Sequence, residues 1–305
     1  MCKAHLRFTP FDPIHSLDGC DRDLIVNDLD ESPFGARAPS PALARIINAT
    51  RRQSDNWLGR RVAYALRSYA KSRLTGPVDI EAMGVKFRLY PTGNVCEKKI
   101  LFTPQFFDLA ERNLICSHIR PGFVFLDIGA NIGGYSLAVA ALAGSDARIV
   151  AIEPQPQIFE RLSYNIAQNP FDTIKAVACA VADQNGELTL FLNHENRGQA
   201  SVKIAAGEQS SGGMIKVPAK SLLSLLQEEN LDHVDAAKLD VEGAEDLIME
   251  PFLRDAPRSL WPKLIFAENI KGRWHKDVRT LLIDHGYKSR MSTVRNVAFE
   301  FVEPV

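Results

Sequence analysis

Three acids stand where strand-like runs of this 305-residue chain end, and acids in such places can bind a ligand or move a proton. Asp127 closes the run "FLDI", Glu153 closes "RIVAIE" and Asp240 closes "DAAKLD". Helix-like stretches lie between most of the strand-like runs, which is typical of a parallel sheet covered on both faces. In such sheets ligands bind outside the carboxyl ends of the strands. We therefore expect the three acids to face one site.

The turn "FLDIGANIGGYS" limits what that site can hold. Gly129 and Gly133 remove side chains at a point where helix N–H groups face the ligand. The spacing is close to the dinucleotide pattern G-x-G-x-x-G, but Asn131 occupies the position that must be bare for a pyrophosphate. Asp127 would repel a pyrophosphate, whereas it suits a ligand with an ammonium group. These residues indicate S-adenosylmethionine.

Two further acids fit the nucleoside part of that ligand. Glu153 follows Gly129 by 24 residues, and a carboxylate at the end of a second strand can accept hydrogen bonds from both ribose hydroxyls. Asp183, in "AVAD", lies after the third strand, where an acid could accept a bond from the adenine amino group. Each has a structural alternative, since Glu153 could begin a helix and "ADQNGE" could be an ordinary turn.

The segment "KLDVEGAE" contains the candidate catalytic residues. We predict that Asp240 positions the methyl acceptor or takes its proton, with Glu242 as the nearest rival. Glu268, which ends the run "FAE", could line the acceptor pocket. The chain has no H-x-x-H or H-E-x-x-H pattern and its acids are spread over several strand ends, so the sequence leaves metal dependence open and we assign no metal ligands.

The composition is that of a soluble globular protein, with 46% hydrophobic and 24% charged residues. The formal net charge of −1 argues against a nucleic-acid partner. No run approaches the ~20 apolar residues of a membrane span, and the first residues lack the pattern of a secretory signal. Five scattered cysteines indicate reduced thiols. We expect a cytoplasmic protein that acts on a small molecule or a glycan; the sequence does not determine its oligomeric state.

The chain divides into an N-terminal extension, residues 1–77, and a main domain, residues 78–305. Residues 1–40 are irregular, while residues 41–75 hold eight Lys and Arg against one Asp, with apolar residues at helical spacing. We predict one or two basic amphipathic helices there, dispensable for binding the methyl donor. We favour a solvated helix that caps the main domain; for its basic face, the alternative partners are a membrane surface, an acidic substrate or nucleic acid.

The main domain is predicted to begin with a hairpin, since "VDIEAMGVKFRLY" has two short alternating runs about Met83-Gly84. Besides the runs named above, "IKAVACAV" and "PKLIFAE" are each predicted to be one strand of the sheet. The last two runs, "YKSRM" and "NVAFEFV", are separated by only a few residues, so we expect them to form an antiparallel hairpin at the edge of the sheet. Helices are predicted over "PQFFDLAERNLICSHI" and over residues 134–143, 156–168, 219–229, 243–253 and 273–285.

Four blocks in order carry a family resemblance: "FLDIGANIGGYS", "AIEPQP", "AVADQNGELTLF" and "KLDVEGAE". Together they resemble the FkbM-type methyltransferases, a branch of the class I S-adenosylmethionine-dependent enzymes, over roughly residues 78–305. The resemblance implies a doubly wound, Rossmann-like seven-stranded sheet with an antiparallel last strand. It also implies methylation of a hydroxyl oxygen on a sugar, a polyketide or another small metabolite.

The chain departs from the family pattern at two places beside the active face. Leu223, in "SLLSLL", replaces an acid that family members often carry before the fourth strand, and "EPF" replaces a Gly-Ala after "EGAE". We therefore do not infer the identity of the methyl acceptor from the family.

Two other classes of function stay open. A nicotinamide-dependent oxidoreductase could use Glu153 to hold the ribose, although Asp127 and Asn131 count against it. A catalytically silent binding module could keep the pocket and use residues 41–75 for a partner.

Overall fold

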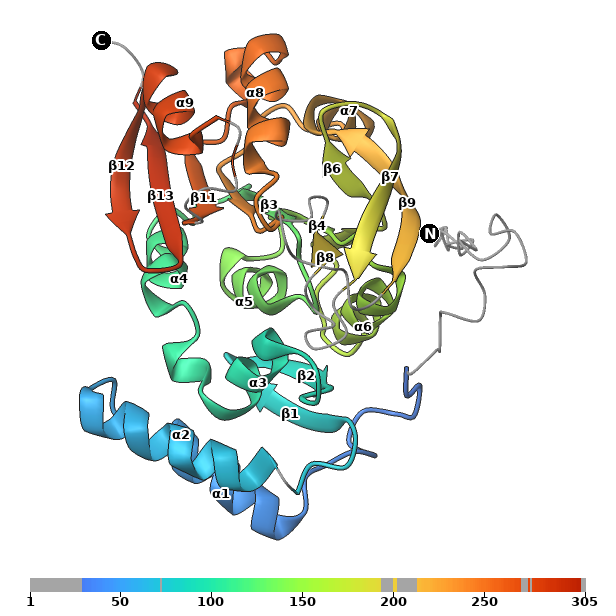
Figure 1. Ribbon diagram of the computed structural model, residues 1–305, viewed down its shortest axis with the longest axis vertical. Helices are drawn as coiled ribbons and strands as arrows, with labels where there is room; N and C mark the ends of the chain where they lie inside the picture. Colours follow the sequence, from blue (N-terminus) through green and yellow to red (C-terminus); the bar gives the residue numbers. More distant parts are fainter. Residues whose placement is uncertain are drawn as a thin grey trace, which may run out of the picture.

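The computed structural model describes residues 29–71, 73–192, 200–201, 213–269, 274 and 276–302, and the structural statements below concern these residues. The irregular structure predicted for residues 1–28 lies outside them. At the centre is a seven-stranded sheet in the order β12-β13-β11-β10-β3-β4-β5 (Figure 1). Its strands are β3 (Val124–Ile128), β4 (Arg148–Ile152), β5 (Ile174–Val177), β10 (Ala236–Leu239), β11 (Leu264–Glu268), β12 (Tyr287–Ser292) and β13 (Asn296–Phe301).

Five neighbouring strands, from β11 to β5, run parallel, and β13 is antiparallel to both β11 and β12. The predicted fold class and the predicted hairpin at the edge of the sheet are therefore confirmed. The prediction held because only a few residues separate the last two strand-like runs, which is too short for a crossover helix.

Alternate residues of each central strand face opposite hydrophobic layers. In β3, Phe125 lies in one cluster, whereas Leu126 and Ile128 lie in the other. The same period of two continues in β4, where Ile149 and Val150 separate in the same way. A sheet buried on both faces needs helices on both faces.

The helices supply those two layers. Toward the Phe125 face pack α4 (Leu109–Cys116), α5 (Gly134–Ala143) and α6 (Pro156–Ala167). Toward the opposite face pack α7 (Leu222–Glu228), α8 (Glu245–Asp255) and α9 (Val278–Asp284). The two short 3-10 helices are η3 (Pro104–Phe106) and η4 (Arg258–Leu260). Each predicted helix of the main domain is present, with its ends moved by a few residues.

A second, four-stranded sheet was not expected from the sequence. Its order is β6-β9-β7-β8, from β6 (Ala180–Ala182), β7 (Gly186–Leu192), β8 (Ala200–Ser201) and β9 (Met214–Ser221). The run "IKAVACAV" was predicted as one strand, but it divides, so that β5 belongs to the central sheet and β6 to the second. Each half pairs with a different neighbour, β4 and β9 respectively.

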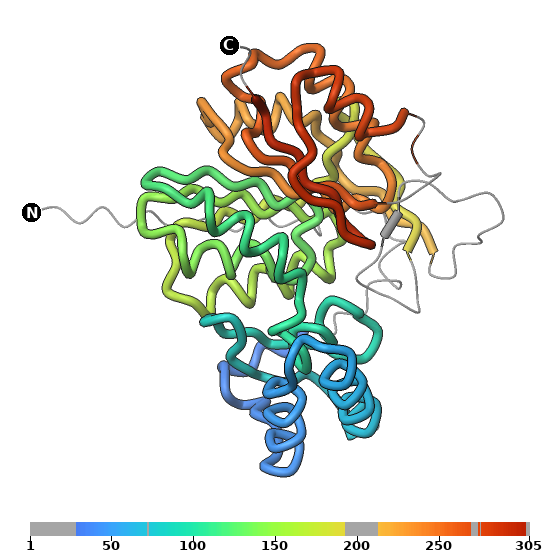
Figure 2. The backbone as a smooth tube through the Cα atoms, turned by 90° about the vertical axis from the view of Figure 1, so that its left-hand side faces the viewer, coloured from blue at the N-terminus to red at the C-terminus, as the bar shows by residue number. Residues whose placement is uncertain are grey.

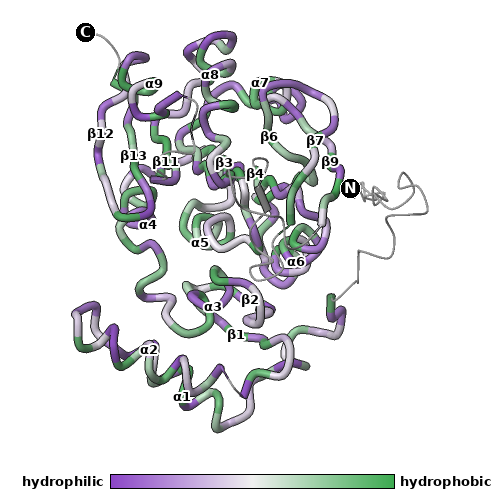
Figure 3. The backbone as a smooth tube through the Cα atoms, in the orientation of Figure 1, coloured by the Kyte–Doolittle hydropathy of each residue, from purple (hydrophilic) through white to green (hydrophobic). Residues whose placement is uncertain are grey.

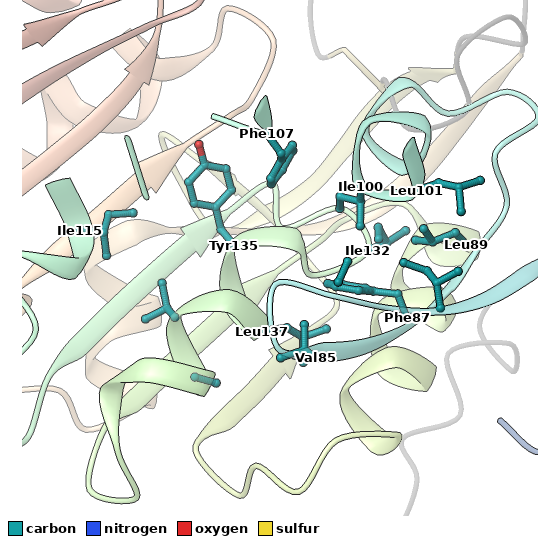
Figure 4. Packing of buried hydrophobic residues seen from close by; sticks show 14 of the residues in the cluster. Val85, Phe87, Leu89, Ile100, Leu101, Phe107, Ile115, Ile132, Tyr135 and Leu137 are labelled. Atoms are coloured by element: carbon teal, nitrogen blue, oxygen red, sulfur yellow. The ribbon is translucent and has the colours of Figure 1, made fainter. Parts of the chain in front are cut away.

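A hairpin and a helix connect the N-terminal segment with the main body. The hairpin predicted about Met83-Gly84 is present as β1 (Val78–Ala82) and β2 (Val85–Leu89). In Figure 4 its residues Phe87 and Leu89 lie beside Ile132 of the glycine turn, and all three are fully buried. Helix α3 (Val95–Phe102), which the sequence analysis did not predict, begins at Asn94, whose side chain caps it by accepting from two backbone N–H groups.

Two helices precede the hairpin and lie side by side at one end of the molecule (Figure 2). They are α1 (Pro41–Arg51) and α2 (Trp57–Lys71), which confirms the predicted basic helices. Leu43 and Ile47 of α1 belong to the same hydrophobic cluster as Phe125. The α1 helix is thus packed into the main core.

The apolar stripe that predicted α2 is not its buried face. Hydrophilic and hydrophobic residues alternate along this helix (Figure 3), but its buried residues are small: Gly59, Ala63 and Ala70. Leu58 is 62% exposed and Tyr69 56% exposed. The two helices pack against each other, and Gly59 lies against the loop between them, where an added Cβ would be 2.3 Å from the Ser54 carbonyl oxygen. Within the described residues, no helix is both long enough and apolar enough to cross a bilayer.

Candidate active site

A cleft of about 400 Å³ lies at the carboxyl ends of β3, β4, β10 and β11. This volume is in the range of small-molecule sites. Of the eight residues predicted for the site, six line the cleft: Asp127, Gly129, Asn131, Glu153, Asp240 and Glu242. Parallel strands bring their carboxyl ends to one edge, so residues more than 100 positions apart in the chain meet here.

The turn between β3 and α5 approaches β10 so closely that only glycine fits. An added Cβ at Gly129 would lie 2.1 Å from the backbone oxygen of Asp240, and the φ of Gly129 is +80°. Asn131 also has a positive φ, of 52°, and Gly133, with φ 89°, is the N-cap of α5. Gly133 does not line the cleft itself; it allows the chain to enter the helix that borders it.

Asp127 lies at the bottom of the cleft and is anchored by α5. Its Oδ2 accepts hydrogen bonds from the Ser136 N–H (3.0 Å) and from the Ser136 hydroxyl (2.6 Å). Burial raises the pKa of Asp127, while the nearby Lys238 ammonium opposes that shift. The side chain is 1% exposed, so its role toward a bound ligand is limited to the atoms that border the cleft.

Glu153 is held in place by two backbone donors. Its Oε2 accepts from the Asn131 N–H and its Oε1 from the Gln155 N–H, both at 2.9 Å. Burial raises the pKa of Glu153 to about 7, although both N–H groups favour the ionised form. These contacts connect the end of β4 with the glycine turn and orient the carboxylate at the cleft wall.

The structure does not bring Asp183 to the cleft. Asp183 is exposed and does not line it; Val181 and Leu190 form that part of the wall, together with Cys179. The extra strand β6 explains this, because it carries the chain out of the central sheet before Asp183 is reached. The adenine-binding role of Asp183 stays a prediction.

A buried lysine organises the predicted catalytic residues. Lys238 Nζ lies 2.5 Å from Asp240 Oδ2 and 4.8 Å from the centre of the Tyr135 ring. Burial alone would raise the pKa of Asp240, but the Lys238 ammonium outweighs it, so that this pKa is lowered. A carboxylate oxygen of Glu268 lies within 4.8 Å of one of Asp240, and burial together with the charges of Asp240 and Glu242 raises the pKa of Glu268 well above its usual range. These shifts favour the ionised form of Asp240 and the protonated form of Glu268.

The same acids offer oxygen ligands for a divalent cation. One carboxylate oxygen from each of Asp240, Glu242 and Glu268 lies within 4.8 Å of the other two. Such a trio could hold Mg²⁺ or a similar hard ion. The sequence analysis did not detect this cluster because it comes from two strand ends and has no local spacing pattern.

Other residues of the cleft were also missed by the sequence analysis. Asn94 and Lys99 come from α3 and its cap, which the sequence analysis did not predict, and Arg295 comes from the turn between β12 and β13. Among these residues, Lys238 could have been predicted from the sequence. It stands two residues before Asp240, and residues at i and i+2 of a strand share a face.

The comparisons with known proteins agree with this geometry. The model of the methyltransferase FkbM domain matches residues 127–289, which is more than half of the chain. The chain belongs to the FkbM methyltransferase family. It is an S-adenosylmethionine-dependent methyltransferase, so the predicted enzyme class and cofactor are confirmed. The oxidoreductase alternative is thereby set aside.

Solved structures resemble this family member in fold. The METTL16 methyltransferase domain is 15% identical and has a TM-score of 0.46, with 87% of this chain and 93% of that one covered. The fibrillarin of Aeropyrum pernix, in complex with natively bound S-adenosyl-L-methionine, is 12% identical with a TM-score of 0.40, covering 74% and 84%. Precorrin-6y C5,15-methyltransferase from Geobacter metallireducens is 15% identical with a TM-score of 0.37, covering 63% and 87%. A search of curated proteins finds no match.

Proposed function

We propose that this enzyme methylates a hydroxyl oxygen of a sugar, a glycan or another small metabolite. The observation that carries the proposal is the position of the Asp240 carboxylate. It lies at the carboxyl end of β10, is paired with the Lys238 ammonium, and is next to the glycine turn. A carboxylate in this place can accept a hydrogen bond from a neutral hydroxyl and turn its oxygen toward the donor.

The cleft residues fit S-adenosylmethionine. The bare backbone at Gly129 allows a ligand to approach the turn closely, and Glu153 presents a fixed carboxylate that can accept from ribose hydroxyls. Asp127, Glu153, Asp240 and Glu242, together with Asp108, outnumber the cationic residues of the cleft, which are Lys99, Lys238 and Arg295. An acidic cleft favours a cationic ligand, and S-adenosylmethionine carries both a sulfonium and an ammonium group.

The donor supplies an electrophilic methyl group on its sulfonium. The protein must then place the acceptor oxygen in line behind that methyl group, and such positioning can lower the barrier by roughly 7–11 kcal/mol. Asp240 is suited to orient the hydroxyl. Because Lys238 lowers its pKa, Asp240 is a weak base that takes the proton only as the new oxygen–carbon bond forms. Glu268 is already protonated, which leaves Glu242 as the rival base.

The experiment is an incubation of the purified protein with labelled methyl donor and a panel of sugars, glycans and small metabolites. We expect label in a product whose methyl ether survives mild base. Parallel thermal melts with S-adenosylhomocysteine and with NAD should show stabilisation by the first only. Donor binding without transfer to any hydroxyl, or transfer to nitrogen or carbon alone, would refute the proposal.

A further inference from the structure

A second hollow continues from the donor cleft toward α2. It has a volume of about 940 Å³ and shares four lining residues with the cleft: Val95, Lys99, Asp108 and Arg295. A molecule whose hydroxyl reaches Asp240 would therefore extend into this hollow, which we call the α2 groove. Its other walls come from α2, from η3 and α4, and from the turn at Val294.

The charge of the α2 groove is opposite to that of the donor cleft. Its acidic residues already have partners: Asp55 is paired with Arg60 at 2.5 Å, Asp108 Oδ2 accepts from the Tyr135 hydroxyl, and Glu111 accepts from Thr293 and Asn296. Arg67, Lys71 and Arg295 line the groove as well, and no carboxylate in the described ranges pairs with them. The groove therefore presents a surplus of positive charge.

This positive charge is concentrated rather than dispersed. Lys98, on the neighbouring α3, has its pKa lowered by burial and then by the charges of Lys71 and Arg67. Like charges this close repel one another and give the fold no benefit, so their convergence is better explained by a ligand. Lys99 connects the two hollows: it lines both, lies 3.9 Å from Asp108, and its charge lowers the pKa of Asp240.

One face of helix α2 lines the groove with basic and aromatic side chains. Arg60, Tyr64, Arg67 and Lys71 recur at intervals of three or four along α2, so they share the face that lines the groove. Tyr64 and Phe106 add aromatic surface, with Arg67 lying 5.9 Å from the Tyr64 ring centre and Arg60 5.4 Å from that of Phe106. Aromatic rings beside guanidinium groups suit a ligand with both a ring and an anionic group.

We propose that the α2 groove binds the anionic part of the methyl acceptor, and that the acceptor is a sugar-sized molecule carrying a phosphate or a carboxylate group. The assignment rests on the proposed function, since it extends the same acceptor site. The cationic donor then binds in the acidic cleft, and the anionic acceptor binds in the basic groove. The charge of each site therefore repels the ligand of the other site. A nucleic acid is disfavoured because the chain has a net charge of −1 and the surplus of positive charge is confined to one groove.

The first test uses inorganic phosphate on the full chain saturated with S-adenosylhomocysteine. We expect phosphate to raise the melting temperature of the native protein and of the control R61A/R73A, whose two arginines lie outside the groove, but not that of R67A/K71A. Lys71 is exposed, so Lys71→Glu gives a second variant if R67A/K71A is unstable. Absence of a phosphate effect in the native protein, or an equal effect in both double variants, would overturn the inference.

The second test separates the sources of the anion. Transfer of labelled methyl is measured to glucose 6-phosphate, to glucuronate, to glucose and to a short RNA. Transfer to either anionic sugar, at least 10-fold slower in R67A/K71A than in R61A/R73A, supports the proposal. Transfer to neutral sugar alone at equal rates in both variants, or transfer to RNA, overturns it. Binding of S-adenosylhomocysteine, measured alongside, shows whether a failure concerns this groove or the proposed function itself.

Discussion

Lys238 and Asp240 form a buried ion pair at the carboxyl end of β10, with 2.5 Å between Nζ and Oδ2. The lysine is 5% exposed, and the carboxylates of Asp240 and Asp127 raise its pKa against the effect of burial. The lysine favours the ionised form of Asp240, and burial, followed by the charge of Asp240, raises the pKa of the neighbouring Glu268. Two predictions follow from this arrangement, one for each partner.

Asp240→Asn keeps the shape of the side chain but removes its charge. We expect turnover to fall by roughly 10²–10⁴-fold if Asp240 takes the acceptor's proton. Donor affinity, measured by calorimetry, should change little, because the residues that we propose to bind the donor lie mostly at the ends of β3 and β4. Normal turnover would exclude the base role, and an equal loss of donor affinity would place Asp240 in the cofactor pocket instead.

Lys238→Met should change the pH dependence of turnover. In the native protein Lys238 lowers the pKa of Asp240, so Asp240 stays ionised to low pH. Without the ammonium, burial raises that pKa, and the acid limb of the pH–rate profile should move to higher pH. A profile that only decreases in height, with an unmoved acid limb, would show that Lys238 supports the fold and not the ionisation of Asp240.

Glu153→Gln should remove a pH dependence from donor binding. The folded-state pKa of Glu153 is about 7, so the ionised acceptor for the ribose hydroxyls forms as pH rises through that value. In the native protein, affinity for S-adenosylhomocysteine should therefore increase between pH 6 and 8, and the Gln variant should show a flat, weaker affinity. Loss of the charged hydrogen bonds corresponds to roughly 1.5–3 kcal/mol. Unchanged affinity by calorimetry would refute the ribose assignment.

Glu153 also makes the stability of the ligand-free protein depend on pH, and stability should change in the opposite direction to donor affinity as pH rises. Its pKa is raised from 4.5 to about 7, so the folded state binds the proton more tightly than the unfolded state does. Stability of the ligand-free protein should then decrease as pH rises from about 4.5 to about 7. Glu97, buried beside Arg161 with a pKa also raised to about 7, contributes in the same window. Glu153→Gln should therefore reduce this decrease without abolishing it.

The packing of the N-terminal helices gives a prediction about stability. Ile47 is 3% exposed and belongs to the main core cluster, and Thr50 donates a hydrogen bond to the backbone of Phe102. We expect Ile47→Ala to lower the free energy of unfolding by about 2–5 kcal/mol. Leu58→Ala, at a position 62% exposed, is the matched control and should change it by less than about 0.5 kcal/mol. Equally small effects of the two substitutions in urea unfolding would support the prediction that residues 41–75 are dispensable for binding the methyl donor.

Metal removal tests the cluster of Asp240, Glu242 and Glu268. Lys238 and the proton on Glu268 already offset much of the negative charge of these three acids. We therefore expect turnover to be unchanged by EDTA. A loss of turnover that Mg²⁺ restores would instead show that the three carboxylates hold a divalent cation.

The sequence by itself determined the central sheet and the residues at its carboxyl edge. Short apolar runs such as "FVFLDI" and glycines at a strand–helix turn are local patterns, and they do not depend on distant contacts. For that reason Asp127, Glu153 and Asp240 were correctly expected to meet. The hairpin about Met83-Gly84 was likewise readable from turn chemistry alone.

Tertiary structure decided what depends on packing between distant segments. The run that was predicted as a single strand divides because β6 finds a partner in β9, some 40 residues later, and Asp183 leaves the cleft with it. The inward face of α2 is made of small residues because α1 packs closely against it, which no periodicity of apolar residues reveals. The two hollows also exist only in the folded chain, since Lys99 and Arg295 reach them from opposite ends of the main domain. The sequence showed that residues 41–75 are basic, but only the folded chain places part of that positive charge in a groove next to the acidic cleft.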